Sequence, residues 1–222
     1  MDPIESDTLR LEPLVAAHAE EMFAPLSAIA IYDYIPGDPP LSAAALRERY
    51  IRLEKGRSAD GRQQWLNWIV RLNSGRCAGF VQATIHPERT GDFAFAFAPE
   101  YWGQGIAFEA CQAALPYLFR ALRVTTLFAT VDPRNARSIR LLLRLGFDEV
   151  TPDDYPHGAV EPNDRVFSFD TQRGGLMIGM IPYVGALVCF LLAAFNAPAK
   201  GVNFTALGLA FAVMPQVLIR FL

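Results

Sequence analysis

The chain has 222 residues, of which 52% are hydrophobic and 19% charged, and its net charge is −3. It has no Lys/Arg cluster, so the sequence does not indicate a nucleic-acid interface, and we expect none. The three cysteines lie far apart without a CxxC motif, which predicts neither a disulfide framework nor a zinc site, and we expect no metal.

Hydrophobic periodicity predicts elements in the order β-α-α-β-β-β-α-β-α-β. We expect strands at 8–14, 65–72, 78–85, 92–98, 127–131 and 165–169. We expect helices at 15–30, 41–55, 106–122 and 136–145. This order predicts an α/β (α+β) fold in residues 1–170, with a mixed, mostly antiparallel sheet flanked by helices.

A glycine-containing loop, PEYWGQG, joins the strand at 92–98 to the helix at 106–122. Free amide groups and the positive end of the helix dipole meet at such a junction, and glycine lets an anion approach the backbone closely. The loop is neither a Rossmann fingerprint, because Phe108 stands where the third glycine would be, nor a P-loop, because GK[ST] is absent. We therefore predict an anion site.

The C-terminal part of the chain differs from the rest in composition. After a polar linker at 171–174, two nearly uncharged runs follow at 175–196 and 202–220. About 20 apolar residues cross a bilayer, so we predict a two-helix transmembrane hairpin. Arg173 and Arg220 would lie on one side of the membrane and Lys200 on the other. A buried helical hairpin and a hydrophobic dimerisation element are the alternatives.

Three segments resemble the GCN5-related N-acetyltransferase (GNAT) superfamily. The loop is similar to its pyrophosphate motif Q/R-x-x-G-x-G/A, and YWGQGIAFEA is similar to the YWGxGxAxEA of the Rim-type, ribosomal-protein N-acetyltransferase subgroup. VDPRNARSIRLLLRLGF resembles the family's NxxSxxxxxxxGF segment, and TLRLEPL its first strand. The resemblance implies the GNAT fold, with acetyl-CoA as cosubstrate. The backbone that would hold its pyrophosphate is that of Gly103, Gln104, Gly105, Ile106 and Ala107.

The same resemblance assigns three further cofactor contacts. It implies that the Phe97 backbone bonds the pantetheine arm or the acetyl oxygen, in a gap between splayed strands. Asn135 caps a helix and offers an amide to the pantetheine arm. Arg140 would meet the adenosine phosphate, although an exposed helix arginine is the simpler interpretation.

Asp92 and Ser138 are the candidate catalytic residues. Asp92 stands where Rim-type relatives carry a glutamate, and it would accept the amine proton through a water. It could equally be an aspartate that closes the preceding turn. Ser138 takes the place of the general acid in some Rim-type relatives, because the tyrosine that many family members carry is Leu142 here. A capping or surface serine is the alternative.

The sequence thus predicts an N-acetyltransferase that moves the acetyl group of acetyl-CoA directly to a primary amine. The acceptor, a protein N-terminus or a small molecule, is unidentified. We expect the lipid bilayer to hold residues 175–222 and the catalytic domain to lie in the cytoplasm at the bacterial inner membrane. The alternatives are a catalytically inactive acyl-CoA sensor of the same fold and a membrane interaction module.

Overall fold

The computed structural model describes residues 1–171. The chain divides into two units, Met1–Asp170 and Thr171–Leu222. The predicted hairpin at 175–222, with most of the linker before it, lies outside the described residues. Within the described part of the chain, no helix is both long and apolar enough to cross a membrane.

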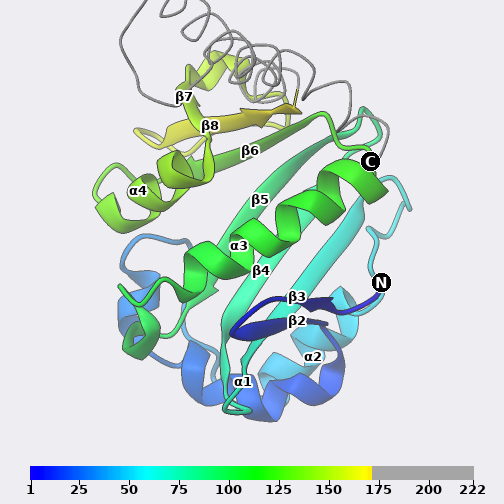
Figure 1. Cartoon of the computed structure of the whole chain (residues 1–222), viewed down its shortest axis with the longest axis vertical. Coiled ribbons are helices and arrows are strands. Elements are labelled where there is room, and N and C mark those ends of the chain that lie inside the picture. The colour runs from blue at the N-terminus through cyan, green and yellow to red at the C-terminus, as the bar shows by residue number, and fades with distance from the viewer. Residues whose placement is uncertain (172–222) are drawn as a thin grey trace, which may run out of the picture. The chain divides into compact units, whose positions relative to one another are not determined.

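The described residues form one mixed sheet with the strand order β1-β2-β3-β4-β5-β6-β8-β7 (Figure 1). Neighbouring strands are antiparallel, except that β5 and β6 are parallel. The predicted mixed, mostly antiparallel sheet is therefore confirmed. The strands are β1 (Ile4–Glu5), β2 (Leu9–Pro13), β3 (Gln64–Leu72), β4 (Cys77–Ile85), β5 (Thr90–Phe97), β6 (Thr126–Val131), β7 (Asp148–Val150) and β8 (Arg165–Asp170).

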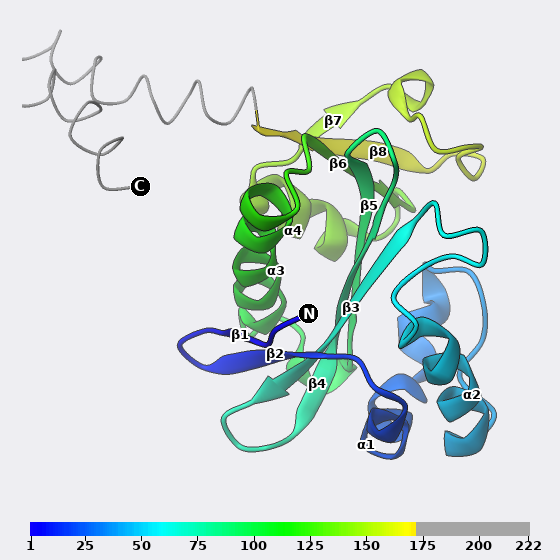
Figure 2. The ribbon, with the colours of Figure 1, turned by 90° about the vertical axis from the view of Figure 1, so that its right-hand side faces the viewer.

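Helices cover both faces of the sheet, with α1 and α2 on one face and α3 and α4 on the other (Figure 2). The α-helices are α1 (Ala19–Leu26), α2 (Ala43–Leu53), α3 (Ile106–Pro116) and α4 (Ala136–Leu145). The short helical turns are η1 (Ala16–His18), η2 (Ile29–Asp33), η3 (Pro99–Tyr101), the π-helical η4 (Tyr117–Ala121) and η5 (Pro152–Asp154).

Local side-chain chemistry explains where several helices begin and end. The Ser42 side chain accepts a hydrogen bond from the Ala45 amide at the start of α2. Asn135 caps α4 in the same way, as predicted. Gly146 follows α4 in the left-handed conformation, with φ of 94°, which glycine adopts without strain.

Two predicted helices are wrong in extent. The helix predicted over 15–30 is broken into η1, α1 and part of η2. At the end of α1, the Phe23 carbonyl accepts from the Ser27 hydroxyl and the Leu26 carbonyl from the Tyr32 hydroxyl. The helix predicted over 106–122 changes to a π turn after Pro116. A proline has no N–H to continue the regular ladder. The short strands β1 and β7 were not predicted.

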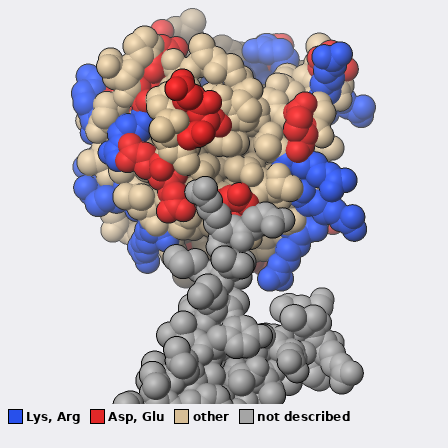
Figure 3. Space-filling view, turned by 90° about the horizontal axis from the view of Figure 1, so that it is seen from above, with Lys and Arg blue, Asp and Glu red and all other residues tan. Residues whose placement is uncertain are grey.

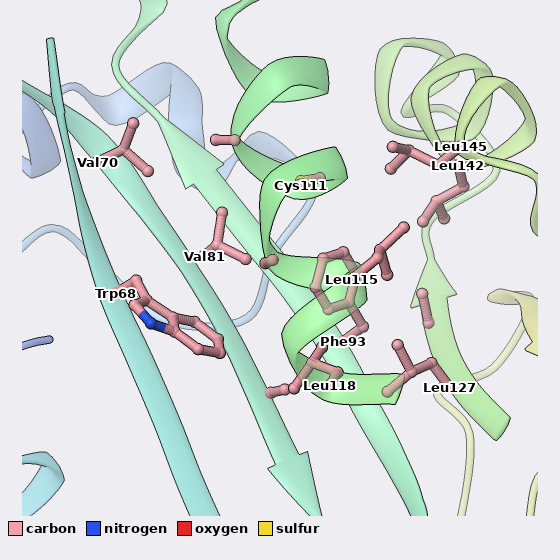
Figure 4. Packing of buried hydrophobic residues seen from close by; sticks show 14 of the residues in the cluster. Trp68, Val70, Val81, Phe93, Cys111, Leu115, Leu118, Leu127, Leu142 and Leu145 are labelled. Atoms are coloured by element: carbon pink, nitrogen blue, oxygen red, sulfur yellow. The ribbon is translucent and has the colours of Figure 1, made fainter. Parts of the chain in front are cut away.

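The core lies between the sheet and α3, and the alternation of β5 places its phenylalanines there (Figure 4). Phe93 and Phe97 are buried in this layer with Trp68, Val81 and Leu115. The alanines between the phenylalanines point to the opposite face, where Ala96 packs with α1 and α2. This period of two fixes which side chains of β5 face each helical layer.

Strands β5 and β6 separate soon after they meet. Their parallel pairing covers only Thr90 with Thr126, Gly91 with Leu127 and Asp92 with Phe128. Beyond these pairs β6 continues to pair with β8 along its length, while β5 continues to pair with β4. The sheet therefore opens between β5 and β6 on the way toward Phe97.

Acidic and basic side chains lie among one another on the face shown in Figure 3. In the described residues, ion pairs also join segments that are distant in sequence. Arg71 of β3 binds both Glu12 of β2 and Glu21 of α1, at 2.9 and 2.7 Å. The Arg71 hydrogen bond lowers the pKa of Glu21. These pairs tie α1 to the sheet on the side opposite α3.

Candidate functional site

A cleft of about 490 Å³ lies where β5 and β6 have separated. Its walls come from the end of β5, the loop after it, the first turn of α3, one side of α4, and the segment around Ile31 and Tyr34. Most of the predicted site residues line this cleft: Phe97, Gly103, Gly105, Ala107, Asn135, Ser138 and Arg140. Two predicted segments, 97–107 and 135–140, thus line the same cleft although they are separate in the sequence.

The start of α3 offers unpaired backbone donors to the cleft. The N-cap residue is Gly105, with φ of 83° and no side-chain capping bond. Gly103 also has a positive φ, and a Cβ at either glycine would meet nothing within 4 Å. These glycines are therefore needed for backbone conformation, and open space lies in front of them. First-turn N–H groups without a side-chain cap, beside open space, have the geometry that can bind an anion.

The neighbours of these glycines have different surroundings. Gln104 and Ile106 do not line the cleft. The Gln104 side-chain amide donates to the Glu100 carbonyl, so its side chain is directed back along the loop. If these two residues contact the pyrophosphate as predicted, they do so through their backbone N–H groups.

Three arginines of α4, Arg137, Arg140 and Arg144, line the cleft. Their spacing of three and four residues places them on one face of the helix. Among the described residues, none of the three forms a salt bridge. Sequence reasoning found Arg140 alone, although the helical spacing of the other two was visible in the sequence. Together they give the cleft a positive wall.

Trp102 connects the two sides of the cleft. Its indole Nε1 donates a hydrogen bond of 2.7 Å to the carbonyl of Phe97, and the Arg137 guanidinium lies 4.7 Å from its ring centroid. The resemblance assigned the Phe97 backbone to a cofactor contact, and here Trp102 occupies the carbonyl. A ligand that uses this carbonyl must share it with the indole or displace it. Sequence reasoning did not predict this role for Trp102.

Asn135 and Ser138 lie together at the start of α4. The Asn135 side-chain oxygen accepts from the Ser138 amide at 3.1 Å, which leaves the Asn135 NH₂ group available to a ligand. The Ser138 hydroxyl forms no hydrogen bond with any residue in the described range. Both side chains border the cleft. The geometry therefore suits a contact with a ligand in the cleft.

Asp92 lies elsewhere. It is five residues before Phe97, about 17 Å along the strand at roughly 3.3 Å per residue, and it does not line the cleft. Its carboxylate lies 2.8 Å from His86 Nε2, from His157 Nδ1 and from the Tyr155 hydroxyl. Burial and the bond to Asp92 raise the pKa of Tyr155. The structure does not bring Asp92 next to Ser138.

Sequence reasoning missed these polar neighbours of Asp92. His86 follows β4, and Tyr155 and His157 follow η5, more than 60 residues later. No local pattern links these segments, because each histidine only flanks a proline-containing turn. Only the pairing of β6 with β8 carries the later segment to Asp92.

Sequence and structure comparisons identify the family of this chain. The profile of the Acetyltransferase (GNAT) domain matches residues 8–148. The chain therefore belongs to the acetyltransferase (GNAT) family, which is a family of acyltransferases. Its sheet, flanking helices and open β5–β6 junction are the GNAT fold that the resemblance implied.

Particular relatives are more distant. Spermidine N(1)-acetyltransferase of Escherichia coli K12 is 35% identical over 75 residues, which are 33% of this chain and 40% of that protein. The match thus spans less than half of that relative's length. The ribosomal-protein-S5-alanine acetyltransferase of Vibrio fischeri has a TM-score of 0.63 at 19% identity, over 77% of this chain and 97% of that one. RimJ of Mycobacterium smegmatis, solved with CoA-disulfide, has a TM-score of 0.63 at 18% identity, over 78% and 87%. These two structures share the fold.

Proposed function

We propose that this chain transfers the acetyl group of acetyl-CoA to a primary amine. One observation carries the proposal: the uncapped N-terminus of α3 lines a cleft between strands that separate. The match to the GNAT domain supports the same conclusion.

The residues of the cleft fit acetyl-CoA. Its pyrophosphate is an anion, and the amides from Gly103 to Ala107 at the start of α3 are donors without a side-chain cap. Arg140, with Arg137 and Arg144 on the same helix, brings positive charge toward the phosphate on the adenosine of acetyl-CoA. The pantetheine arm is flexible and partly apolar, and the walls that it would meet include Phe95, Ala96 and Leu141. Asn135 offers this arm a side-chain NH₂ donor.

Acetyl-CoA supplies the thioester that a neutral amine attacks directly. The protein must hold both partners, remove a proton from the ammonium and return one to the sulfur. We assign the protonation of the sulfur to the Ser138 hydroxyl, which borders the cleft and bonds no described residue. The sequence suggested Asp92 for proton removal, but its carboxylate lies outside the cleft and is bonded to His86 and His157, so we do not assign proton removal to it. No covalent enzyme intermediate is required.

The acceptor is a primary amine of a protein N-terminus or a small molecule. This proposal rests on what the relatives are named for: spermidine in one and a ribosomal protein in another. In this chain the segment with Ala30, Ile31, Tyr34 and Ile35 lines the cleft beside the end of β5. We propose that this segment contacts the acceptor, since it is a wall of the cleft that we have not assigned to acetyl-CoA.

We also propose that residues 175–222 anchor the chain in a bilayer, with the acetyltransferase domain in the cytoplasm. Two observations support this proposal. The sequence has two apolar runs, each long enough to cross a bilayer, and acetyl-CoA is a cytoplasmic cosubstrate. Cell fractionation tests this proposal: the full chain should sediment with membranes, and a chain that ends at residue 171 should not. Equal distribution of the two would contradict it.

Mass spectrometry of acetylated products tests the activity. The purified full chain, in detergent, is incubated with acetyl-CoA and either spermidine or an alanine-initiated peptide. We expect the wild type and Gly61→Glu to acetylate at least one of these two acceptors. We expect Gly105→Glu to acetylate neither. Gly61 is a matched control, because its φ of 72° is also positive and a Cβ there meets nothing within 4 Å.

An acyl-CoA sensor without transfer activity is the second candidate. The position of Asp92 favours it, because that carboxylate is outside the cleft and already accepts three hydrogen bonds. Acetyl-CoA binding that is lost in Gly105→Glu, with no product from either acceptor, would support the sensor. Absence of binding to the folded protein would contradict both candidates.

A further inference from the structure

Three side chains from three separate segments meet beside the junction of β5 and β6. His86 lies in the turn after β4, Asp92 lies in β5, and His157 follows η5. Each offers an atom that can ligate a metal, and these atoms lie within 4.8 Å of one another. The cluster is separate from the acyl-donor cleft, whose lining includes none of the three.

The donor atoms are already close to the spacing that a small cation needs. His86 Nε2 and His157 Nδ1 each lie 2.8 Å from a different oxygen of Asp92. In a tetrahedral zinc site the bonds are about 2.0–2.1 Å, so neighbouring donor atoms are about 3.3 Å apart. To admit the ion, each of these two nitrogens would move about 0.5 Å away from its carboxylate oxygen, and the three ligand atoms, which lie within 4.8 Å of one another, would converge on the ion.

The surroundings of the cluster resemble the outer partners of a metal site. His157 Nε2 lies 2.8 Å from the Thr90 hydroxyl, which would fix its orientation while Nδ1 faces the ion. The Tyr155 hydroxyl donates to Asp92 and orients the carboxylate in the same way. The Phe128 ring packs edge-on against His157, at 5.6 Å between centroids. One wall of the cluster is thus apolar.

Access to the cluster differs among its members. The His157 side chain is 5% exposed and that of His86 13%, but that of Asp92 is 34% exposed. An ion would therefore reach the carboxylate first. The two imidazole rings stack with an angle of 19° between planes, so one must turn before both lone pairs converge.

We propose that His86, Asp92 and His157 bind one divalent transition-metal ion, for which zinc is the best match. Two imidazole nitrogens and one carboxylate favour zinc, cobalt or nickel over magnesium or calcium, which prefer oxygen ligands. On binding, the proton of each facing nitrogen moves to the other ring nitrogen or to solvent. For His157, the proton on Nε2 then donates to Thr90. A fourth position remains for water.

Calorimetric titration of zinc chloride into the untagged full chain tests the proposal. We expect one ion per chain, with affinity lowered about 30-fold or more in His86→Gln and in His157→Gln. His18→Gln is a matched control: it is the remaining histidine of the three in the chain, and it too bonds a carboxylate, Glu12, at 3.2 Å. Its affinity for zinc should be unchanged.

Cobalt absorption of the wild type provides a second measurement that needs no variant. Visible bands of four-coordinate cobalt, lost when zinc is added, would support the site even if His157→Gln failed to fold. The absence of zinc binding to the wild type would overturn the proposal. So would binding that persists unchanged in a folded His86→Gln, or that is lost equally in His18→Gln. The hydrogen-bonded cluster would then be purely structural.

Discussion

At the Phe97 end of β5, backbone donors of the α3 N-terminus have no side-chain cap and face open space. At the Asp92 end, a carboxylate accepts bonds from two histidines and a tyrosine. The two ends of β5 thus differ in their surroundings: uncapped backbone donors of the following loop and helix lie beyond one end, and mutually bonded side chains lie at the other. Uncapped donors beside a cleft indicate a site that is open to a ligand from outside, whereas the bonded side chains also hold segments of the fold together when no ligand is bound.

The strand partners explain why the two ends differ. At Asp92 the strand is paired on both sides, with β4 and β6, and the segment after η5 covers it. At Phe97 the β6 side is open, because β6 has parted from β5. The polar groups of a closed junction must bond one another, while those of an open junction can remain available to a ligand. The predictions below test this contrast.

The largest expected effect is that of Gly105→Glu on the affinity for acetyl-CoA. A carboxylate at the start of α3 would repel phosphate, and a side chain at φ of 83° is strained. We expect affinity to fall at least about 100-fold, which is about 2.7 kcal/mol. Isothermal calorimetry measures it, with Gly61→Glu as control. An affinity within twofold of wild type would remove the anion site from this loop.

Asp92→Ala should lower the stability of the fold. It removes the shared acceptor of His86, His157 and Tyr155, and leaves partly buried donors unpaired. We expect the free energy of unfolding to fall by about 2–3 kcal/mol. Urea unfolding followed by tryptophan fluorescence measures this, and acetyl-CoA affinity should stay within about threefold of wild type. Asp60→Ala, at an exposed loop aspartate, is the control. Equal stability of the two variants would contradict the structural role.

Ser138→Ala should lower turnover while cofactor binding is retained. The substitution removes the hydroxyl but keeps the backbone N–H, which donates to the Asn135 side chain that caps α4. We expect a loss of about 10–100-fold in kcat, the usual range for one proton-transfer group. Steady-state kinetics measure it beside calorimetry with acetyl-CoA. An unchanged kcat would exclude Ser138 as the acid.

Arg140→Ala should have the smallest effect. The guanidinium is exposed, and an interaction with phosphate at such a position contributes about 0.5–1 kcal/mol in ordinary salt. We expect acetyl-CoA affinity to fall about two- to fivefold, with a larger effect at low ionic strength. Arg52→Ala, on the exposed face of α2, should leave the affinity unchanged. Equal losses in both variants would point to net charge rather than to a contact.

Much of the fold was predictable because its longer elements carry periodic patterns. The Phe93–Phe95–Phe97 alternation located β5, and the glycine-containing loop located the start of α3. Strands β1 and β7 have two and three residues, too few to show a period. The Leu26 carbonyl at the end of α1 accepts from the Tyr32 hydroxyl, six residues later, and the periodic pattern did not indicate this bond.

The candidate site divides in the same way. Gly103, Gly105 and Asn135 were predicted because their positions relative to helix starts have a local physical meaning. The cluster around Asp92 was not, because its members are brought together by tertiary pairing. The role of Trp102 also escaped prediction, since a hydrogen bond to the Phe97 carbonyl depends on the path of the loop.

Hydrogen–deuterium exchange of the full chain, with and without CoA, tests the contrast between the two ends of β5 most directly. CoA should slow exchange in peptides that cover 98–110 and 134–146, the segments that line the cleft. Peptides that cover 86–92 and 151–158 should exchange at the same rate in both conditions. Protection confined to the segments around Asp92, or no protection at 98–110 under saturating CoA, would contradict the assignment of the cleft.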